Sequence, residues 1–493
     1  MKIDAEDTIV AISTPMGEGG IGIVRLSGSQ AVPIVMRLFV PKKKKNLAGV
    51  KTFTTHYGHI YDKGKVVEEV LLSVMRAPYT YTREDVAEIS CHGGIVPLRK
   101  VLELCLRQGA RLAEPGEFTL RAFLNGRIDL VQAEAVCDII RARTDAALDC
   151  ALHQLEGDLS KTVNRIREGI VDLLAHIEAC LDCPEEDIPH LSRTEIVESL
   201  EKTSLELREL LKSAQSGRIL REGLKTAIVG KPNVGKSSLL NALLQEEKAI
   251  VTPIPGTTRD VVEDMVDILG IPMKIMDTAG IRHARDEIEM AGVERARRSI
   301  VLADLILFVI DLSIPLSEED CCIAENLLGR KTILVANKCD LPQVVSEKEI
   351  RELWLSCLSR LESEREALFT DPVDPPGDSL SNPSILRNPP LIKVSATKRT
   401  RIKDLQELIY SLFTKGEVSI SDAVLVTNVR HRDALVKAEE SLKEGIGACT
   451  RGDSEEFIAL DLRQALEALG EIVGKTVTED ILSRIFSRFC IGK

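Results

Sequence analysis

The segment from Gly230 to Ser237 carries residue types that can bind the phosphates of a nucleotide. It reads GKPNVGKS, the pattern G-x-x-x-x-G-K-S, after an apolar run and before an amphipathic one. The glycines let backbone N–H groups curl around a β-phosphate, and Lys236 brings a positive charge to the β- and γ-oxygens. The Ser237 hydroxyl can bind Mg²⁺. We therefore expect nucleotide contacts from Asn233, Val234, Gly235, Lys236, Ser237 and Ser238, with Lys236 also acting in catalysis.

Two further segments have the composition of loops that respond to a γ-phosphate. The run MKIMDTAG ends an apolar strand at Asp277, which places a carboxylate at the strand edge where Mg²⁺ binds. The run VTPIPGTTRD places threonines between the first helix and the next strand, as in a loop ordered by the γ-phosphate and its Mg²⁺. From these runs we expect nucleotide contacts from Thr252, Thr257, Thr258, Asp277, Thr278, Ala279 and Gly280.

The run ILVANKCD indicates which base is bound. The Asp340 carboxylate can accept hydrogen bonds from the ring N–H and the exocyclic amine of guanine. Adenine offers neither donor in that arrangement, so its complex would leave the carboxylate unpaired at a cost of ~1 to 3 kcal/mol or more. The run KVSAT follows another strand and supplies the last loop beside the base. These patterns predict a GTPase domain with base-side residues Asn337, Lys338, Asp340, Ser395, Ala396 and Thr397.

The group that positions the attacking water is not fixed by the motifs. Ras-type enzymes use a Gln near the position that Ile281 occupies here, and an isoleucine cannot orient water. The acidic stretch just downstream offers Asp286, Glu287 and Glu289. The motifs alone leave the three carboxylates as alternatives.

Composition limits the other partners. The chain has 493 residues and a formal net charge of −12, so any contact with nucleic acid must come from a local basic patch. Its 10 Phe, 5 Tyr and 1 Trp are too few for repeated base-stacking platforms. The acidic start MKIDAEDTIV is unlike a secretory signal, and the apolar run 299–312 is too short to span a bilayer. With twelve scattered cysteines, we expect a cytoplasmic protein without membrane attachment.

The periodicity of apolar residues predicts a multidomain α/β and all-α protein. Residues 1–125 show short strands and turns, and we expect an α+β domain there. Residues 126–217 and 416–493 have helical spacing, so they should form one discontinuous helical domain. Residues 218–415 alternate strands with helices, which predicts an inserted Ras-like P-loop domain. Its proline-rich stretch 370–390 should be a surface loop.

Blocks outside the GTPase motifs resemble one family. The blocks REDVAEISCHGG, PGEFTLRAFLNGRIDLVQAEAVCDII and VTEDILSRIFSRFCIGK, the last ending the chain, are similar to those of the MnmE (TrmE) tRNA-modification GTPases. The resemblance covers the whole length. It implies an N-terminal domain that forms a homodimer and binds a tetrahydrofolate one-carbon derivative. It also implies a partner flavoprotein, MnmG, which carries FAD and acts with the chain to form 5-carboxymethylaminomethyl or aminomethyl uridine at the tRNA wobble position.

The resemblance also assigns roles to residues of this chain. Those roles are folate binding by Arg25, Glu88, Arg127 and Lys493; potassium binding by Asn233, Thr252, Thr257 and the Ile254 carbonyl; magnesium binding by Ser237 and Thr258; and catalysis by Glu289, which would orient water, and Cys490. Arg127 replaces the Lys often found at that position, which keeps the charge but changes the donor geometry. Potassium would take the place of an arginine finger.

Several features of the sequence have more than one interpretation. The segment between Asp340 and Ser395, residues 341–394, has 54 residues and is longer than the family leads us to expect. Cys183 stands where the family usually has Phe, and it creates a Cys180-x-x-Cys183 pair. Without a second pair or a histidine, two ordinary helix-end cysteines are favoured over a metal site. Gly17–Gly22 fits G-x-G-x-x-G, but the following residues predict a strand, which argues against a dinucleotide site.

The alternative function is a regulatory RNA-binding or ribosome-assembly GTPase. A membrane-remodelling GTPase is not supported, because the sequence shows no basic amphipathic segment that would bind lipid.

Overall fold

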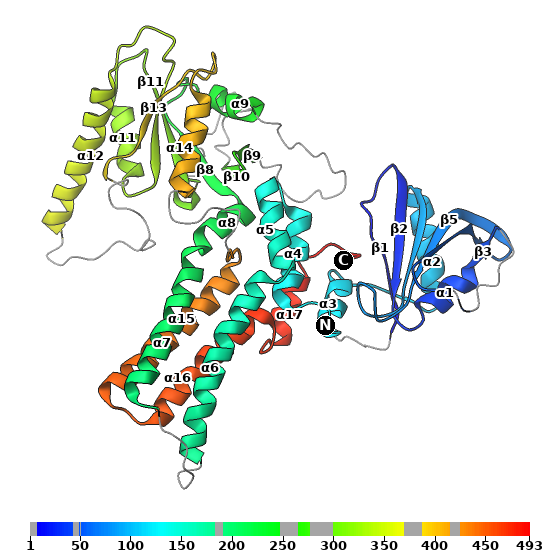
Figure 1. The fold of residues 1–493 in the computed structure, drawn as a ribbon. Coiled ribbons are helices and arrows are strands. Elements are labelled where there is room, and N and C mark those ends of the chain that lie inside the picture. Colours follow the sequence, from blue (N-terminus) through cyan, green and yellow to red (C-terminus); the bar gives the residue numbers. More distant parts are fainter. Residues whose placement is uncertain are drawn as a thin grey trace.

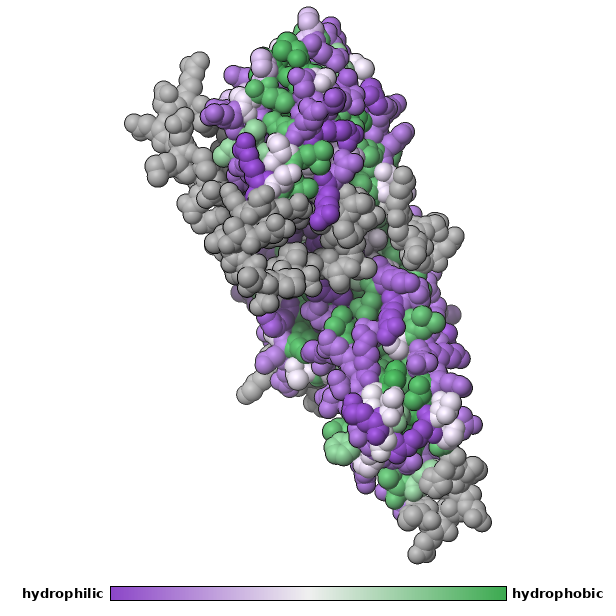
Figure 2. All heavy atoms as spheres, turned by 90° about the vertical axis from the view of Figure 1, so that its left-hand side faces the viewer, coloured by the Kyte–Doolittle hydropathy of each residue, from purple (hydrophilic) through white to green (hydrophobic). Residues whose placement is uncertain are grey.

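The computed structural model describes residues 7–42, 49, 51–182, 191–246, 265–276, 299–368, 387–414 and 424–493. They form an N-terminal sheet domain, a long helical bundle and a nucleotide-type α/β domain at the end of the bundle near α5 and α8 (Figure 1). No helix in these ranges is both long and apolar enough to cross a bilayer. On the face drawn in Figure 2, hydrophilic residues interrupt the hydrophobic ones wherever the surface is coloured.

The N-terminal domain is a seven-stranded sheet with the order β3-β4-β5-β6-β2-β1-β7. Its strands are β1 (Ile9–Ile12), β2 (Gly19–Ser27), β3 (Phe39–Pro41), β4 (Thr54–Asp62), β5 (Lys65–Met75), β6 (Val86–Gly93) and β7 (Arg111–Leu112). All neighbours are antiparallel except β1 and β7. Helices α1 (Ala31–Leu38) and α2 (Ile95–Arg107) share one hydrophobic core with the sheet. The G-x-G-x-x-G segment therefore enters strand β2, as predicted, and no helix opens there.

The helical domain draws its elements from both sides of the α/β domain. Before it come α3 (Glu117–Leu124), α4 (Leu130–Arg141), α5 (Asp145–Leu155), α6 (Asp158–Asp182), α7 (Arg193–Lys212) and α8 (Ala214–Glu222). After it come α15 (Val429–Arg451), α16 (Glu455–Val473) and α17 (Glu479–Phe486). Apolar stripes of α6 and α7 pack with those of α15 and α16 in one core, so neither half encloses that core by itself.

The α/β domain is a doubly wound, mostly parallel sheet with the order β13-β12-β11-β8-β10-β9. Its strands are β8 (Leu224–Val229), β9 (Met265–Ile268), β10 (Ile271–Ile275), β11 (Leu305–Asp311), β12 (Thr332–Asn337) and β13 (Leu391–Lys393). Only β9 runs antiparallel to its neighbour. Its helices are α9 (Lys236–Glu246), α11 (Glu318–Leu327), α12 (Glu347–Leu368) and α14 (Ile402–Thr414).

Two hydrophobic cores cover the two faces of this sheet. Helices α9 and α14 pack on one face through residues such as Leu243 and Ile409. Helices α11 and α12 pack on the other face, where Trp354 is buried. All seven residues of β11 are buried, as expected for a central parallel strand. This layering brings the carboxyl ends of β8, β11 and β12 to one edge, which is where ligands bind in open α/β sheets.

Candidate guanine-nucleotide site and C-terminal tail

The loop from Gly230 to Ser237 joins strand β8 to helix α9 at that edge. A Cβ atom on Gly230 would lie 2.4 Å from the Val309 carbonyl oxygen, and its φ of +154° is one that residues with a side chain rarely adopt. Asn233 has a φ of 63°, in the left-handed region, which is uncommon for a non-glycine residue. The loop thus curls tightly over the start of α9, where the helix N-terminus favours anions.

Lys236 is held at the centre of the loop. Its ammonium donates to the carbonyl oxygens of Gly230 at 2.8 Å and Lys231 at 2.6 Å. Burial lowers the pKa of this lysine, because the charged form loses hydration. Both features fit a phosphate-binding loop, in which nucleotide oxygens would take over as acceptors for the same ammonium.

Asn337 connects the phosphate loop to the base-side loop. Its amide Nδ2 donates to the Val234 carbonyl oxygen at 2.8 Å, and its Oδ1 accepts from the Ala396 backbone N–H at 3.0 Å. The side chain is 2% exposed, so these bonds form away from bulk water. A Cβ on Gly235 would lie 2.2 Å from Asn337 Nδ2, which explains the second glycine of the loop.

The base-side loops follow β12 and β13. Lys338 has a φ of 62°, and its ammonium forms an ion pair with Asp311 at 2.6 Å. Asp340 is exposed at the end of the same turn, and Thr397 is exposed beside the buried Ser395 and Ala396. The Cys339 backbone N–H donates to the Val394 carbonyl oxygen at 3.1 Å, which ties the two loops together. Burial alone would raise the pKa of Asp311, but hydrogen bonds from Lys338 and Ser313 outweigh it and the pKa is lowered.

Two supports of this site were not predicted from the sequence. Asp311 is one of them, although its position at the end of an apolar run could have marked it. The other is the ion pair between Lys231 and Asp320 at 2.6 Å, which ties the phosphate loop to helix α11. Both partners are largely buried, and the Lys231 ammonium also donates to Ser317 at 3.0 Å.

Part of the predicted site lies outside the described residues. This holds for Thr252, Ile254, Thr257, Thr258, Asp277, Thr278, Ala279, Gly280 and Glu289, and for the alternatives Asp286 and Glu287. It also holds for Cys183 and for residues 370–386 of the proline-rich stretch. Cys180, the first member of the Cys-x-x-Cys pair, is buried near the end of α6.

The residues assigned to folate meet the end of the chain at the N-terminal sheet. Arg25 on β2 and Glu88 on β6 are register partners, and their side chains form an ion pair at 2.8 Å. The Arg25 Nη1 atom also donates to the Gly492 carbonyl oxygen at 3.2 Å. Burial lowers the pKa of the neighbouring Lys493 ammonium, and the charge of Arg25 adds to this effect.

Arg127 lies on the same side of the domain, against Tyr81. Its guanidinium lies 4.7 Å from the centre of the Tyr81 ring and donates to the Tyr81 carbonyl oxygen at 3.2 Å. Burial raises the pKa of Tyr81, while a hydrogen bond with Thr119 and the charges of Arg127 and Arg25 oppose the increase. Tyr81 therefore contacts Arg127 and feels the charge of Arg25, which the sequence did not indicate.

The C-terminal tail, which brings Gly492 to Arg25, is fixed by side-chain packing just before Cys490. The rings of Phe486 and Phe489 lie 5.3 Å apart and are buried in a core with α3 and α4. A Cβ on Gly116, which has a φ of +72°, would lie 2.6 Å from the Phe486 carbonyl oxygen. Cys490 itself is exposed. The tail thus carries an exposed cysteine two residues before Gly492, which Arg25 contacts.

These observations define a P-loop protein of the guanine-nucleotide-binding class, in which the nucleotide domain interrupts a helical bundle that also carries an N-terminal α+β domain. Comparisons with known proteins agree with this architecture. A family model described as the MnmE helical domain matches residues 130–490, and one described as the GTP-binding protein TrmE N-terminus matches residues 8–127.

Similar proteins span the whole chain. The tRNA modification GTPase MnmE of Thermoanaerobacter pseudethanolicus is 48% identical over 489 residues, which is 99% of both chains. The protein of the same name from Bacillus subtilis is 46% identical over 490 residues, or 99% of this chain and 100% of that one. The chain belongs to the MnmE family of tRNA modification GTPases. The family resemblance and the fold class inferred from the sequence are thereby confirmed.

Proposed function

We propose that this GTPase acts on tRNA, together with an MnmG flavoprotein that carries FAD, to form 5-carboxymethylaminomethyl or aminomethyl uridine at the wobble position. The one-carbon unit would come from a tetrahydrofolate derivative. The relatives are named as tRNA modification GTPases, which supports the tRNA substrate. The protein would act in the cytoplasm, since the eleven cysteines in the described part of the chain are free thiols.

The observation that carries the folate part of the proposal is the contact between Arg25 and Gly492. It joins residues 467 positions apart and brings Gly492, two residues after the exposed Cys490, onto an arginine–glutamate pair. A carboxylate such as that of Glu88 can accept hydrogen bonds from the amino-substituted ring of a folate, and Arg25 and Arg127 can bind its carbonyl or carboxylate groups. Lys493 adds a further donor. The residues present therefore fit a folate derivative.

For the nucleotide reaction, each residue has a distinct proposed role. Lys236 would stabilise charge on the γ-phosphate, Ser237 and Thr258 would bind Mg²⁺, and Glu289 would orient the attacking water. Potassium would bind Asn233 with Thr252, Thr257 and the Ile254 carbonyl when two nucleotide domains of a homodimer associate. The left-handed backbone at Asn233 supports this, because it holds that residue at the exposed lip of the loop.

The proposal is tested by mass spectrometry of wobble uridines in a strain that lacks the protein. We expect the wild-type gene to restore the modified uridine and Cys490→Ser to abolish it while GTP hydrolysis remains near normal. Cys183→Ser is the matched control and should behave as wild type. Full restoration by Cys490→Ser would limit the tail cysteine to a structural role. If the wild-type gene did not affect wobble uridines, a regulatory RNA-binding or ribosome-assembly GTPase would be the better description.

A further inference from the structure

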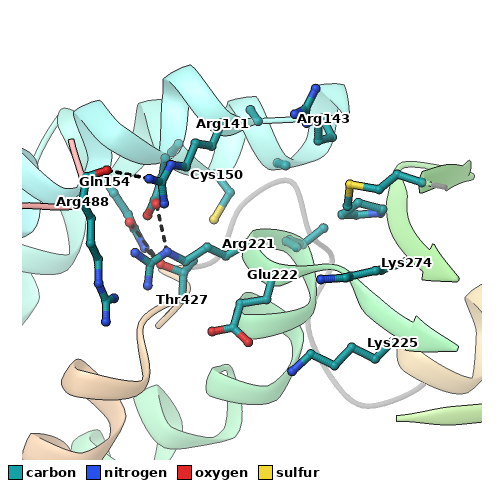
Figure 3. Close-up of a pocket in the computed structure, with 17 residues that line it drawn as sticks. Arg141, Arg143, Cys150, Gln154, Arg221, Glu222, Lys225, Lys274, Thr427 and Arg488 are labelled. Carbon is teal, nitrogen blue, oxygen red and sulfur yellow. Dashed lines mark hydrogen bonds and ion pairs between the residues drawn. The ribbon is translucent and has the colours of Figure 1, made fainter. Parts of the chain in front are cut away.

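A basic cavity lies where the helical bundle meets the nucleotide domain. It has a volume of about 390 Å³, within the range of pockets that hold a ligand. Its walls come from helices α4, α5 and α8 and from strands β8, β9 and β10. Arg488, two residues before Cys490, closes another side (Figure 3). The cavity therefore borders both the GTPase domain and the tail proposed to act in modification.

Positive charge is concentrated in this cavity. Six basic and two acidic side chains line it, a net charge of +4 in a protein whose net charge is −12. Of the acidic residues, Asp138 forms an ion pair with Arg221 at 2.9 Å, and Glu222 lies 3.9 Å from Arg218, which is not among the lining residues. Such a local reversal of sign attracts an anion.

The strand register places two of these charges directly beside each other. Lys225 on β8 and Lys274 on β10 are paired in the parallel ladder, so their side chains leave the same face of the sheet. Like charges directly opposite each other on neighbouring strands are destabilising. Figure 3 shows both lysines extending into the cavity, toward Arg221 and Glu222. An anion between them would convert this repulsion into attraction.

The lining residues favour a phosphate over a ring as the ligand group. Among the described residues that line the cavity there is no Phe, Tyr or Trp on which a base could stack. Lysine and arginine side chains contact the phosphate backbone of nucleic acids without reading sequence. The Arg141 Nη2 atom donates to the Arg488 carbonyl oxygen at 2.5 Å, so the wall of the cavity is joined to the tail.

We propose that this cavity binds phosphates of the tRNA backbone, with Lys225 and Lys274 on the nucleotide domain and Arg221 and Arg488 on the helical side. The inference rests on the proposed action on tRNA, and it goes beyond it by locating the RNA on this chain. A backbone held here runs past the residues that precede Cys490. Because the donors belong to two domains, the bound RNA also fixes the nucleotide domain against the bundle.

The test measures binding of an unmodified tRNA transcript to the full-length protein by fluorescence anisotropy, from about 50 to 200 mM salt. The double variant Lys225→Gln/Lys274→Gln should bind roughly tenfold or more weakly, and its plot of log K against log salt should be shallower by about 1.4 to 1.8. The variant Lys225→Arg/Lys274→Arg should keep most of the affinity. The matched control, Lys202→Gln/Lys437→Gln on exposed positions of α7 and α15, should bind as wild type does.

Stability provides a second readout. The glutamine and arginine variants should unfold at similar urea concentrations, so a loss of tRNA affinity in the glutamine variant alone reports on binding and not on folding. Equal tRNA affinity and salt dependence in the wild type and the glutamine variant would overturn the proposal, as would a wild-type chain that binds no tRNA. If the glutamine variant lost the ability to bind inorganic pyrophosphate but still bound tRNA as the wild type does, the cavity would be a site for small anions and not for tRNA. The wobble-uridine assay reports separately on the proposed function.

Discussion

Replacing Asn337 with alanine should weaken the nucleotide domain at the centre of its site. The substitution removes one acceptor and one donor, which leaves the Val234 carbonyl and the Ala396 N–H without this partner in a region where Asn337 is 2% exposed. An unsatisfied buried polar group costs about 1 to 3 kcal/mol. With two such groups, we expect the free energy of unfolding to fall by about 2 to 6 kcal/mol.

The chain offers a reporter for this domain alone. Trp354 is the single tryptophan, and it is buried under the sheet in helix α12. Its fluorescence during urea unfolding should therefore follow the nucleotide domain and not the other two. Adding GDP at ~100 times its Kd should stabilise the wild type by about 2.7 kcal/mol, and the same GDP concentration should stabilise Asn337→Ala by less, because its phosphate loop is no longer braced.

Asn326→Ala is the matched control for this prediction. Asn326 lies on helix α11 of the same domain, is exposed, and donates to the Cys322 carbonyl oxygen at 2.7 Å. Its replacement should change the free energy of unfolding by no more than about 0.5 kcal/mol. If Asn337→Ala were no more destabilised than Asn326→Ala, the bridge between the two loops would be energetically unimportant and our reasoning about the site would be wrong.

Three predictions concern the reaction itself. Asp340→Asn should weaken GTP binding by about 10-fold or more and improve xanthosine triphosphate binding, and unchanged GTP affinity in a titration would contradict guanine recognition by this carboxylate. GTP turnover should be about 10³-fold faster in potassium than in sodium, so equal rates in the two buffers would exclude the potassium role. Glu289→Ala should reduce hydrolysis by about 10²-fold or more with near-normal nucleotide binding. The variants Asp286→Ala and Glu287→Ala should be milder, and the opposite ranking would reassign the water-orienting role.

The nucleotide site was accessible from the sequence because its parts are local. The residues from Gly230 to Ser237 specify a turn and a helix start within one stretch, so spacing alone predicts their chemistry. Asn337 was predicted as a base-side residue, but its bonds to Val234 and Ala396 depend on the order of strands β8, β12 and β13 in the sheet. Hydrophobic periodicity indicates that these strands exist but not which of them are neighbours.

Contacts between distant segments were beyond such reasoning. The meeting of Arg25 with Gly492 depends on how the last helix packs against α3, and only family resemblance pointed to it. The pairing of Lys225 with Lys274 is set by the register of strands β8 and β10. A shift of this register by one residue would abolish the pairing. Tyr81 was missed for a similar reason, since its partners lie on other elements.

The shared core of the helical bundle has a consequence for synthesis of the protein on the ribosome. Helix α7 ends at Lys212, but α15, against which it packs, begins only at Val429. At the usual rate of ~5 to 20 residues per second, roughly 10 to 40 s pass between the emergence of these two helices. During that interval the nucleotide domain can fold, while the apolar stripes of α6 and α7 stay uncovered. The nascent chain should therefore depend on chaperones most strongly between these two points of elongation.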